Sequence, residues 1–202
     1  MGRMEHWATW DLRLGMRLLP ILKPAEWEGL AHGARAHLWL GTPDFPLVFV
    51  GYAWENGDEL TYVTRQGSEH DETDDLIGQA FDNLEAYDTP FETVETNGAR
   101  LLVSAGRPFA AERVMSEGFM LGVHAELGSD RVVVSIPKRG SMLASAWDSP
   151  REARTTIVSL HLEAWRSAGH SEYITDHLIV FEMGLLAGTL SVTADGVVEG
   201  WS

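Results

Sequence analysis

The sequence predicts an α+β fold: a single domain with a mostly antiparallel sheet, open to some parallel pairing, and amphipathic helices packed on it. Three observations predict it. Asn-Gly pairs at 56–57 and 97–98 each separate two β-type runs, as in tight hairpins. Apolar residues recur at helical spacing over 73–87 and again after Pro150. No linker, repeat or composition break divides the chain, so we expect one domain over 1–202.

The N-terminal segment, residues 1–33, is predicted to be helical. Residues 5–19 carry Trp and Leu side chains at helical spacing and end before a proline. Pro24 suits the first turn of a second, shorter helix, which would end near Gly33.

The sheet and its covering helices are expected over 34–190, and a C-terminal tail over 191–202. Strands are predicted at 36–40, 47–54, 60–64, 91–95, 100–104, 131–136, 178–182 and 185–190, and helices at 73–87, 108–128 (broken at Gly118 and Gly122) and 150–168, while 141–147 is ambiguous. The run 131–136 is continuous and β-branched, which predicts a central strand with the helices at 73 and 149 packed on its sheet. The predicted core comprises Phe81, Leu84, Val133, Ile157, Leu160 and Trp165.

The overall composition excludes several classes of protein. Thirty acidic against fifteen basic residues give a net charge of −15, which argues against nucleic-acid and anionic-membrane partners. The absence of cysteine excludes disulfide frameworks, thiolate metal sites and cysteine nucleophiles. No apolar run has the length of a secretory leader or a membrane span. We therefore expect a soluble, cytoplasmic protein.

The negative charge is concentrated between Glu55 and Glu95, where thirteen carboxylates stand against Arg65 alone, a net charge of −12. One interpretation is a solvated face that keeps the protein in solution. The other is a surface that attracts a basic protein. Asp71, Asp74 and Asp75 lie in the densest part and are candidate binding residues. The segment lacks the pattern of a calcium-binding loop, so we expect no metal there.

Catalytic motifs are absent from the sequence: it has no phosphate-binding loop and no Gly-x-Ser-x-Gly elbow. His161, His170 and His177 lack metal-ligand spacing of their own, so we expect neither a metal nor a cofactor.

Four further residues are candidate binding residues, each with a simpler structural interpretation. Asn83 lies beside core positions of a predicted helix, where its amide would bond to a neighbouring strand or face a pocket. Lys138 and Arg139 follow the central strand, where paired cations bind carboxylates or phosphates or stand in a solvated turn. Trp54 lies beside a hairpin turn and is expected to be partly exposed, as is Trp201 at the C-terminus.

The order of several short motifs resembles an uncharacterised bacterial family, domain of unknown function 1444, over residues 47–190. The motifs are Phe49-Val50-Gly51-Tyr52, Leu60-Thr61-Tyr62-Val63-Thr64, Ala80-Phe81-Asp82-Asn83-Leu84, the strand 132–136 followed by Pro137-Lys138-Arg139, and Tyr173-Ile174-Thr175-Asp176-His177-Leu178. This chain has Gly140-Ser141 where the family usually has an acid after the basic pair. The resemblance implies an α+β fold and a bacterial cytoplasmic protein, but no activity.

Two functions follow from these observations. The favoured one is a non-enzymatic protein-binding domain with an acidic face, of which an immunity or antitoxin-like protein covering a basic nuclease site is one version. The alternative is a small hydrolase or transferase with a pocket around Asn83, Lys138 and Arg139. The sequence leaves a homo-oligomer open.

Overall fold

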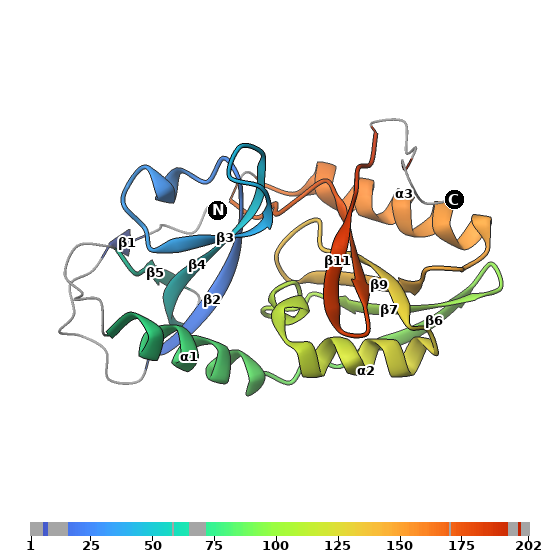
Figure 1. Cartoon of the computed structure of the whole chain (residues 1–202), viewed down its shortest axis with the longest axis horizontal. Coiled ribbons are helices and arrows are strands. Elements are labelled where there is room, and N and C mark those ends of the chain that lie inside the picture. Colours follow the sequence, from blue (N-terminus) through green and yellow to red (C-terminus); the bar gives the residue numbers. More distant parts are fainter. Residues whose placement is uncertain are drawn as a thin grey trace. The chain divides into compact units, whose positions relative to one another are not determined.

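The computed structural model describes residues 6–7, 16–57, 59–64, 72–169, 171–193 and 198. The chain divides into two compact units, residues 1–88 and 89–202. Each unit contains its own sheet, and helices cover the strands (Figure 1). The predicted α+β class with mostly antiparallel strands is confirmed, and the strands form two sheets where the sequence suggested one. Whether the two units unfold together as one domain stays a prediction.

Unit 1 contains a five-stranded sheet in the order β1-β5-β4-β2, with β3 also paired to β4. Its strands are β1 (His6–Trp7), β2 (Arg17–Pro24), β3 (Ala36–Gly41), β4 (Pro46–Asn56) and β5 (Glu59–Tyr62). The hairpin of β4 and β5 turns after Asn56, as the Asn-Gly pair predicts. β1 pairs with β5 in parallel, and the other pairings of this sheet are antiparallel.

The predicted N-terminal helices are wrong where the structure describes them. Residues 17–24 form β2, which pairs along its whole length with β4, and a single turn of 3-10 helix, η1 (Glu28–Leu30), replaces the second helix. Leu18, Leu19, Ile21 and Leu22 are all fully buried. A strand covered on both faces has an apolar run that local periodicity does not distinguish from a helix. Most of the first predicted helix lies outside the described residues.

The helix α1 (Glu72–Glu85) packs against β2 of unit 1 rather than on the sheet that contains 131–136, which corrects its expected position. Ala80 and Leu84 are fully buried on its inner face. Phe81 is only half-buried, so its predicted place in the core is wrong. The buried positions are four residues apart, and Phe81 follows Ala80 by one residue, about 100° further around the helix.

Unit 2 contains a six-stranded antiparallel sheet in the order β11-β10-β8-β9-β7-β6. Its strands are β6 (Glu92–Thr96), β7 (Ala99–Ala105), β8 (Arg131–Ser135), β9 (Ser141–Ala146), β10 (Leu178–Glu182) and β11 (Leu185–Leu190). The central position of β8 is confirmed, and the ambiguous segment is the strand β9. The second Asn-Gly hairpin is also confirmed: Asn97 and Gly98 join β6 to β7, and both have positive φ.

The helices of unit 2 are η2 (Glu112–Met115), α2 (Glu117–Leu127) and α3 (Arg151–Ser167). Gly118 and Gly122 lie inside α2, so the predicted breaks at these residues are wrong: a glycine inside a helix costs about 1 kcal/mol relative to alanine but does not end the helix. The helix ends at Gly128, which is left-handed.

The helix α3 packs Ile157, Val158 and Leu162 into a core shared with strands of unit 2. Leu160 is 39% exposed and Trp165 is half-buried, which corrects two predicted core positions. Leu160 lies between the buried positions in sequence, but the helical period turns it toward solvent.

Candidate functional site

The candidate residues of unit 1 have structural partners or lie at the surface. The amide nitrogen of Asn83 donates to the carbonyl of Leu18 on β2 at 3.0 Å. This contact corresponds to the simpler interpretation of Asn83, a hydrogen bond from the helix to a neighbouring strand. Trp54 is half-buried on β4, and Asp75 is exposed on α1. Asp71 lies outside the described residues, as do Trp201 and the side chain of Asp74.

Lys138 and Arg139 belong to unit 2, at the turn that follows β8. Lys138 forms an isolated β-bridge with Tyr173, and the backbone N–H of Arg139 donates to the carbonyl of Glu172 at 2.9 Å. The guanidinium of Arg139 lies 6.0 Å from the ring centre of Phe109. The basic turn is thus joined through its backbone to the segment before β10. Asn83 belongs to unit 1, so the pocket expected around Asn83, Lys138 and Arg139 stays a prediction.

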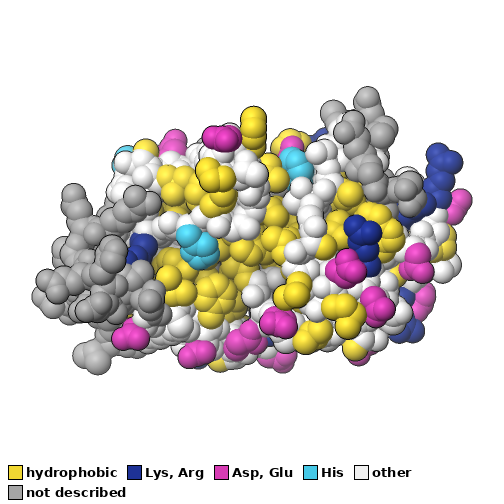
Figure 2. All heavy atoms as spheres, in the orientation of Figure 1, with side chains coloured by type: hydrophobic (Ala, Val, Ile, Leu, Met, Phe, Trp, Pro, Cys, Tyr) yellow, Lys and Arg dark blue, Asp and Glu magenta, His cyan; other side chains and the backbone are white. Residues whose placement is uncertain are grey.

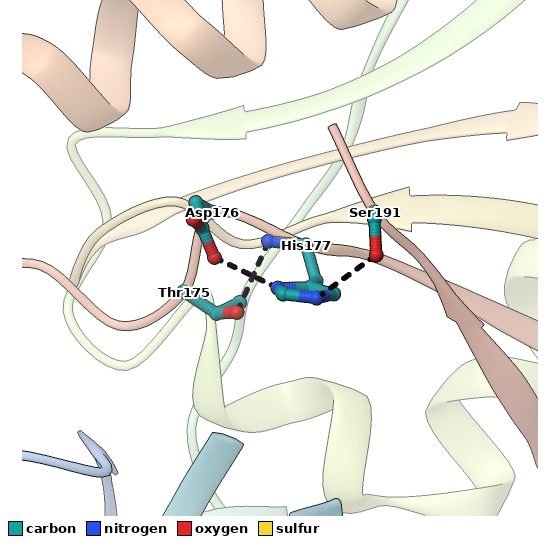
Figure 3. A network of polar contacts seen from close by, with 4 residues as sticks. All are labelled: Thr175, Asp176, His177 and Ser191. Carbon is teal, nitrogen blue, oxygen red and sulfur yellow. Dashed lines mark hydrogen bonds and ion pairs between the residues drawn. The ribbon is translucent and has the colours of Figure 1, made fainter. Parts of the chain in front are cut away.

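The segment joined to the basic turn continues into a cluster of four polar residues, Thr175, Asp176, His177 and Ser191 (Figure 3). His177 Nδ1 lies 2.7 Å from Asp176 Oδ1, and His177 Nε2 lies 3.3 Å from Ser191 Oγ. The backbone N–H of His177 donates to Thr175 Oγ1 at 3.1 Å, which fixes the chain where it enters β10. The two imidazole nitrogens therefore face a carboxylate on one side and a hydroxyl on the other.

His177 and Ser191 are neighbours because of the register between β10 and β11. Leu178 pairs with Leu190, so the next pair of the same register is His177 with Ser191. Residues paired in this way have Cβ atoms about 4.5–5.5 Å apart. Nearer the turn that joins β10 to β11 the register is shifted by one residue: Phe181 pairs with Leu186, whereas Val180 pairs with Gly188. The β-bulge that includes Ala187 thus aligns the hydroxyl with the imidazole.

The protonation of the cluster follows from the carboxylate. The hydrogen bond from His177 lowers the pKa of the Asp176 carboxyl and outweighs the opposing effect of its partial burial. An ionised carboxylate only accepts hydrogen bonds, so His177 Nδ1 carries the proton that is shared with Asp176. In the neutral imidazole Nε2 then has a free lone pair, which accepts the hydroxyl proton of Ser191.

A second histidine lies in the interior beside this cluster. His161 on α3 is fully buried, and its Nδ1 shares a hydrogen bond of 2.9 Å with Ser135 Oγ on β8. Burial lowers the pKa of His161 to about 4, although the nearby Asp176 acts in the opposite direction. His161 is therefore neutral at pH 7 and stays neutral at mildly acidic pH, where an ordinary histidine is protonated.

Sequence reasoning did not bring these polar residues together. The spacing of His161, His170 and His177 predicts helix-surface and turn histidines rather than metal ligands, whereas His161 is fully buried and His170 lies outside the described residues. Within the described part of the chain, no three His, Asp or Glu side chains form a group that could hold a metal ion. The signal in the sequence is the adjacent pair Asp176-His177 just before a predicted hairpin. A regular hairpin with a two-residue turn at Met183-Gly184 would, however, pair His177 with Leu190 instead of Ser191.

Comparisons of the chain with protein-family models, with curated proteins and with solved structures found no match. The resemblance to domain of unknown function 1444 therefore stays a prediction. Among the described helices, none has the length and apolar character needed to cross a membrane.

Proposed function

We propose that this protein is a protein-binding domain whose partner adds an extended, basic segment to the edge strand β11. The observation that supports the proposal is the contrast between the two edges of the unit 2 sheet. At one edge, β6 carries the exposed charges Glu92 and Glu95. At the other, β11 (Leu185–Leu190) carries no charge and no proline. Natural sheets protect their edges with such residues or with β-bulges, and the regular parts of an uncharged edge can accept a strand from a partner.

The side chains around the start of β11 form a mixed apolar and acidic surface. Met183, Leu185, Leu186 and Leu121 of α2 are between 41% and 61% exposed. Met183 and Leu185 flank Gly184, which packs so closely against Leu121 that a Cβ added to the glycine would lie 3.1 Å from the Leu121 side chain. We call these four side chains the β11 patch. Leu185 and Leu186 are successive strand residues and point to opposite faces of the edge, so an added strand would meet exposed apolar side chains on both faces, as is typical of protein-binding surfaces.

Three acidic residues lie next to the β11 patch, in the chain or by contact. Glu117 approaches Gly184, the carbonyl of Asp130 accepts the N–H of Met183 at 2.9 Å, and Glu182 ends β10. All three residues are exposed. Arg131 pairs across the sheet with Glu182, and its guanidinium lies 3.8 Å from the ring centre of Trp147. Figure 2 shows acidic side chains among apolar ones over the region where Figure 1 draws this turn and α2.

The partner that fits this surface is an extended segment in which apolar side chains alternate with lysine or arginine. Backbone hydrogen bonds would supply affinity, and the carboxylates would favour basic sequences and accelerate association at low salt. The bulge in β11 divides the strand, so regular pairing is expected with Leu185–Leu186 or with Gly188–Leu190. An immunity or antitoxin-like protein that covers a basic enzyme is one version of this function.

The test is an NMR titration of the ¹⁵N-labelled full chain with a decapeptide that alternates valine and lysine. We expect chemical-shift changes concentrated at 182–190, which weaken as salt is added, and no binding of the matched valine–glutamate peptide. Leu186→Lys should weaken the binding. Val94→Lys is the matched control, because Val94 lies on the opposite edge strand and is 43% exposed, against 41% for Leu186. Equal effects of the two substitutions, or shift changes that avoid β11, would refute the proposal.

A further inference from the structure

We propose that Ser191, His177 and Asp176 form a nucleophilic site at which Ser191 attacks small carboxylic esters. This activity is independent of the protein-binding function, and it uses different residues from the pocket expected around Asn83. Its basis is the order of the contacts: hydroxyl to Nε2 at 3.3 Å, and Nδ1 to carboxylate at 2.7 Å. A nucleophile, a base and a group that orients the base are the elements of hydroxyl activation.

The geometry assigns a role to each side chain. Asp176 is a positioning residue that holds the proton of His177 on Nδ1, so that Nε2 faces Ser191. Thr175 accepts the His177 N–H and holds the backbone from which the imidazole projects. The distance of 3.3 Å is long for a hydroxyl hydrogen bond, but such contacts often shorten only when substrate binds.

The reaction balances with an ester and water. Ser191 Oγ bonds to the ester carbonyl carbon as its proton passes to His177 Nε2. The tetrahedral intermediate collapses, the bond to the alcohol oxygen breaks, and the alcohol leaves with that proton. Water then gives a proton to His177 Nε2 and attacks the acyl group, after which Ser191 recovers its proton and the carboxylic acid is released.

The exposure of the site limits its substrates. The side chain of Asp176 is 47% exposed and that of His177 21%, and Ser191 is exposed. An open site holds little of a substrate, so small acyl groups with good leaving groups are favoured. The net charge of −15 repels anions, so neutral and cationic esters are favoured over acidic ones. General-base assistance predicts an acceleration of about 10²–10⁴-fold over the unassisted hydroxyl.

The probes are a biotinylated fluorophosphonate, which labels activated serines, and 4-nitrophenyl acetate. We expect an adduct that mass spectrometry locates on Ser191, and its loss in Ser191→Ala. Ser159→Ala is the matched control, since Ser159 is an exposed serine of α3, and it should keep the labelling rate of the wild type. Circular dichroism melts establish that each variant is folded.

The histidine and aspartate variants separate catalysis from structure. His177→Ala should lower the labelling rate about 100-fold or more, and added imidazole should restore part of it, which a purely structural role would not allow. Asp176→Asn should remove most of the general-base acceleration of about 10²–10⁴-fold, which lowers kcat for the acetate with little change in KM, because it alters the tautomer and not substrate contact. An adduct at another residue, no adduct, equal rates in Ser191→Ala, or no imidazole rescue would each overturn the proposal.

Discussion

Ser135 Oγ on β8 and His161 Nδ1 on α3 lie 2.9 Å apart in the interior of unit 2. This hydrogen bond joins the central strand of the sheet to the helix that covers it. His161 is fully buried and Ser135 is also fully buried, so neither group has water as an alternative partner. The pair therefore makes the stability of unit 2 sensitive to the charge of one imidazole.

We expect acid to destabilise the protein through His161. Its pKa is about 4 in the folded state against 6.5 as the ordinary value, so the unfolded chain binds the proton more tightly. The stabilisation is complete above pH 6.5 and is lost as the pH falls through 4, by on the order of 3 kcal/mol. Urea unfolding at pH 7.5, 5.5 and 4.5 measures it. The double variant Ser135→Ala/His161→Leu should show a smaller loss; an identical loss would contradict the assignment.

The two faces of α3 predict different costs for removing an aliphatic side chain. Ile157 is fully buried in the unit 2 core, whereas Leu160, three residues later, is 39% exposed. Ile157→Ala should lower the free energy of unfolding by about 2–5 kcal/mol. Leu160→Ala should lower it by less than about 1 kcal/mol. Chemical denaturation of both variants checks the prediction, and similar losses would mean that the buried face of α3 is misassigned.

The amide of Asn83 should contribute to the stability of unit 1. It satisfies the carbonyl of Leu18 at the interface of α1 and β2, and Leu18 is fully buried. Asn83→Ala should cost about 1–3 kcal/mol, because that carbonyl would lose a partner. Gln79→Ala, at an exposed position of the same helix, is the control and should change stability by less than about 0.5 kcal/mol. Equal thermal shifts in the two variants would argue against a structural role.

Salt should stabilise the free protein. Asp75, Asp82, Asp88 and Glu92 are exposed within the segment that carries a net charge of −12. Glu95 pairs with Arg100 at 3.1 Å, an exposed contact of small energetic value. Ions screen repulsion between such carboxylates over about 8–10 Å, so the melting temperature should rise up to physiological salt. A melting temperature that falls as sodium chloride is added would show that attractive pairs dominate.

Local sequence patterns predicted the hairpins and the long helices well. The pairs Asn56-Gly57 and Asn97-Gly98 located two tight turns, because few residues adopt the backbone conformation that such turns need. Helical periodicity located α1 and α3. The identity of Ile157 as a core residue followed from the same period. These features depend on interactions between residues close in sequence, which the sequence itself specifies.

Tertiary structure alone decided how these elements combine. The run Leu18–Leu22 became a strand because α1 covers it and β4 pairs with it, and both partners are distant in sequence. The alignment of His177 with Ser191 depends on one extra residue in β11, because a single-residue shift changes every cross-strand neighbour beyond it. Composition determined the net charge of this protein and excluded the chemistry that requires cysteine. Register and burial, which arise from long-range packing, decided which of its polar groups meet.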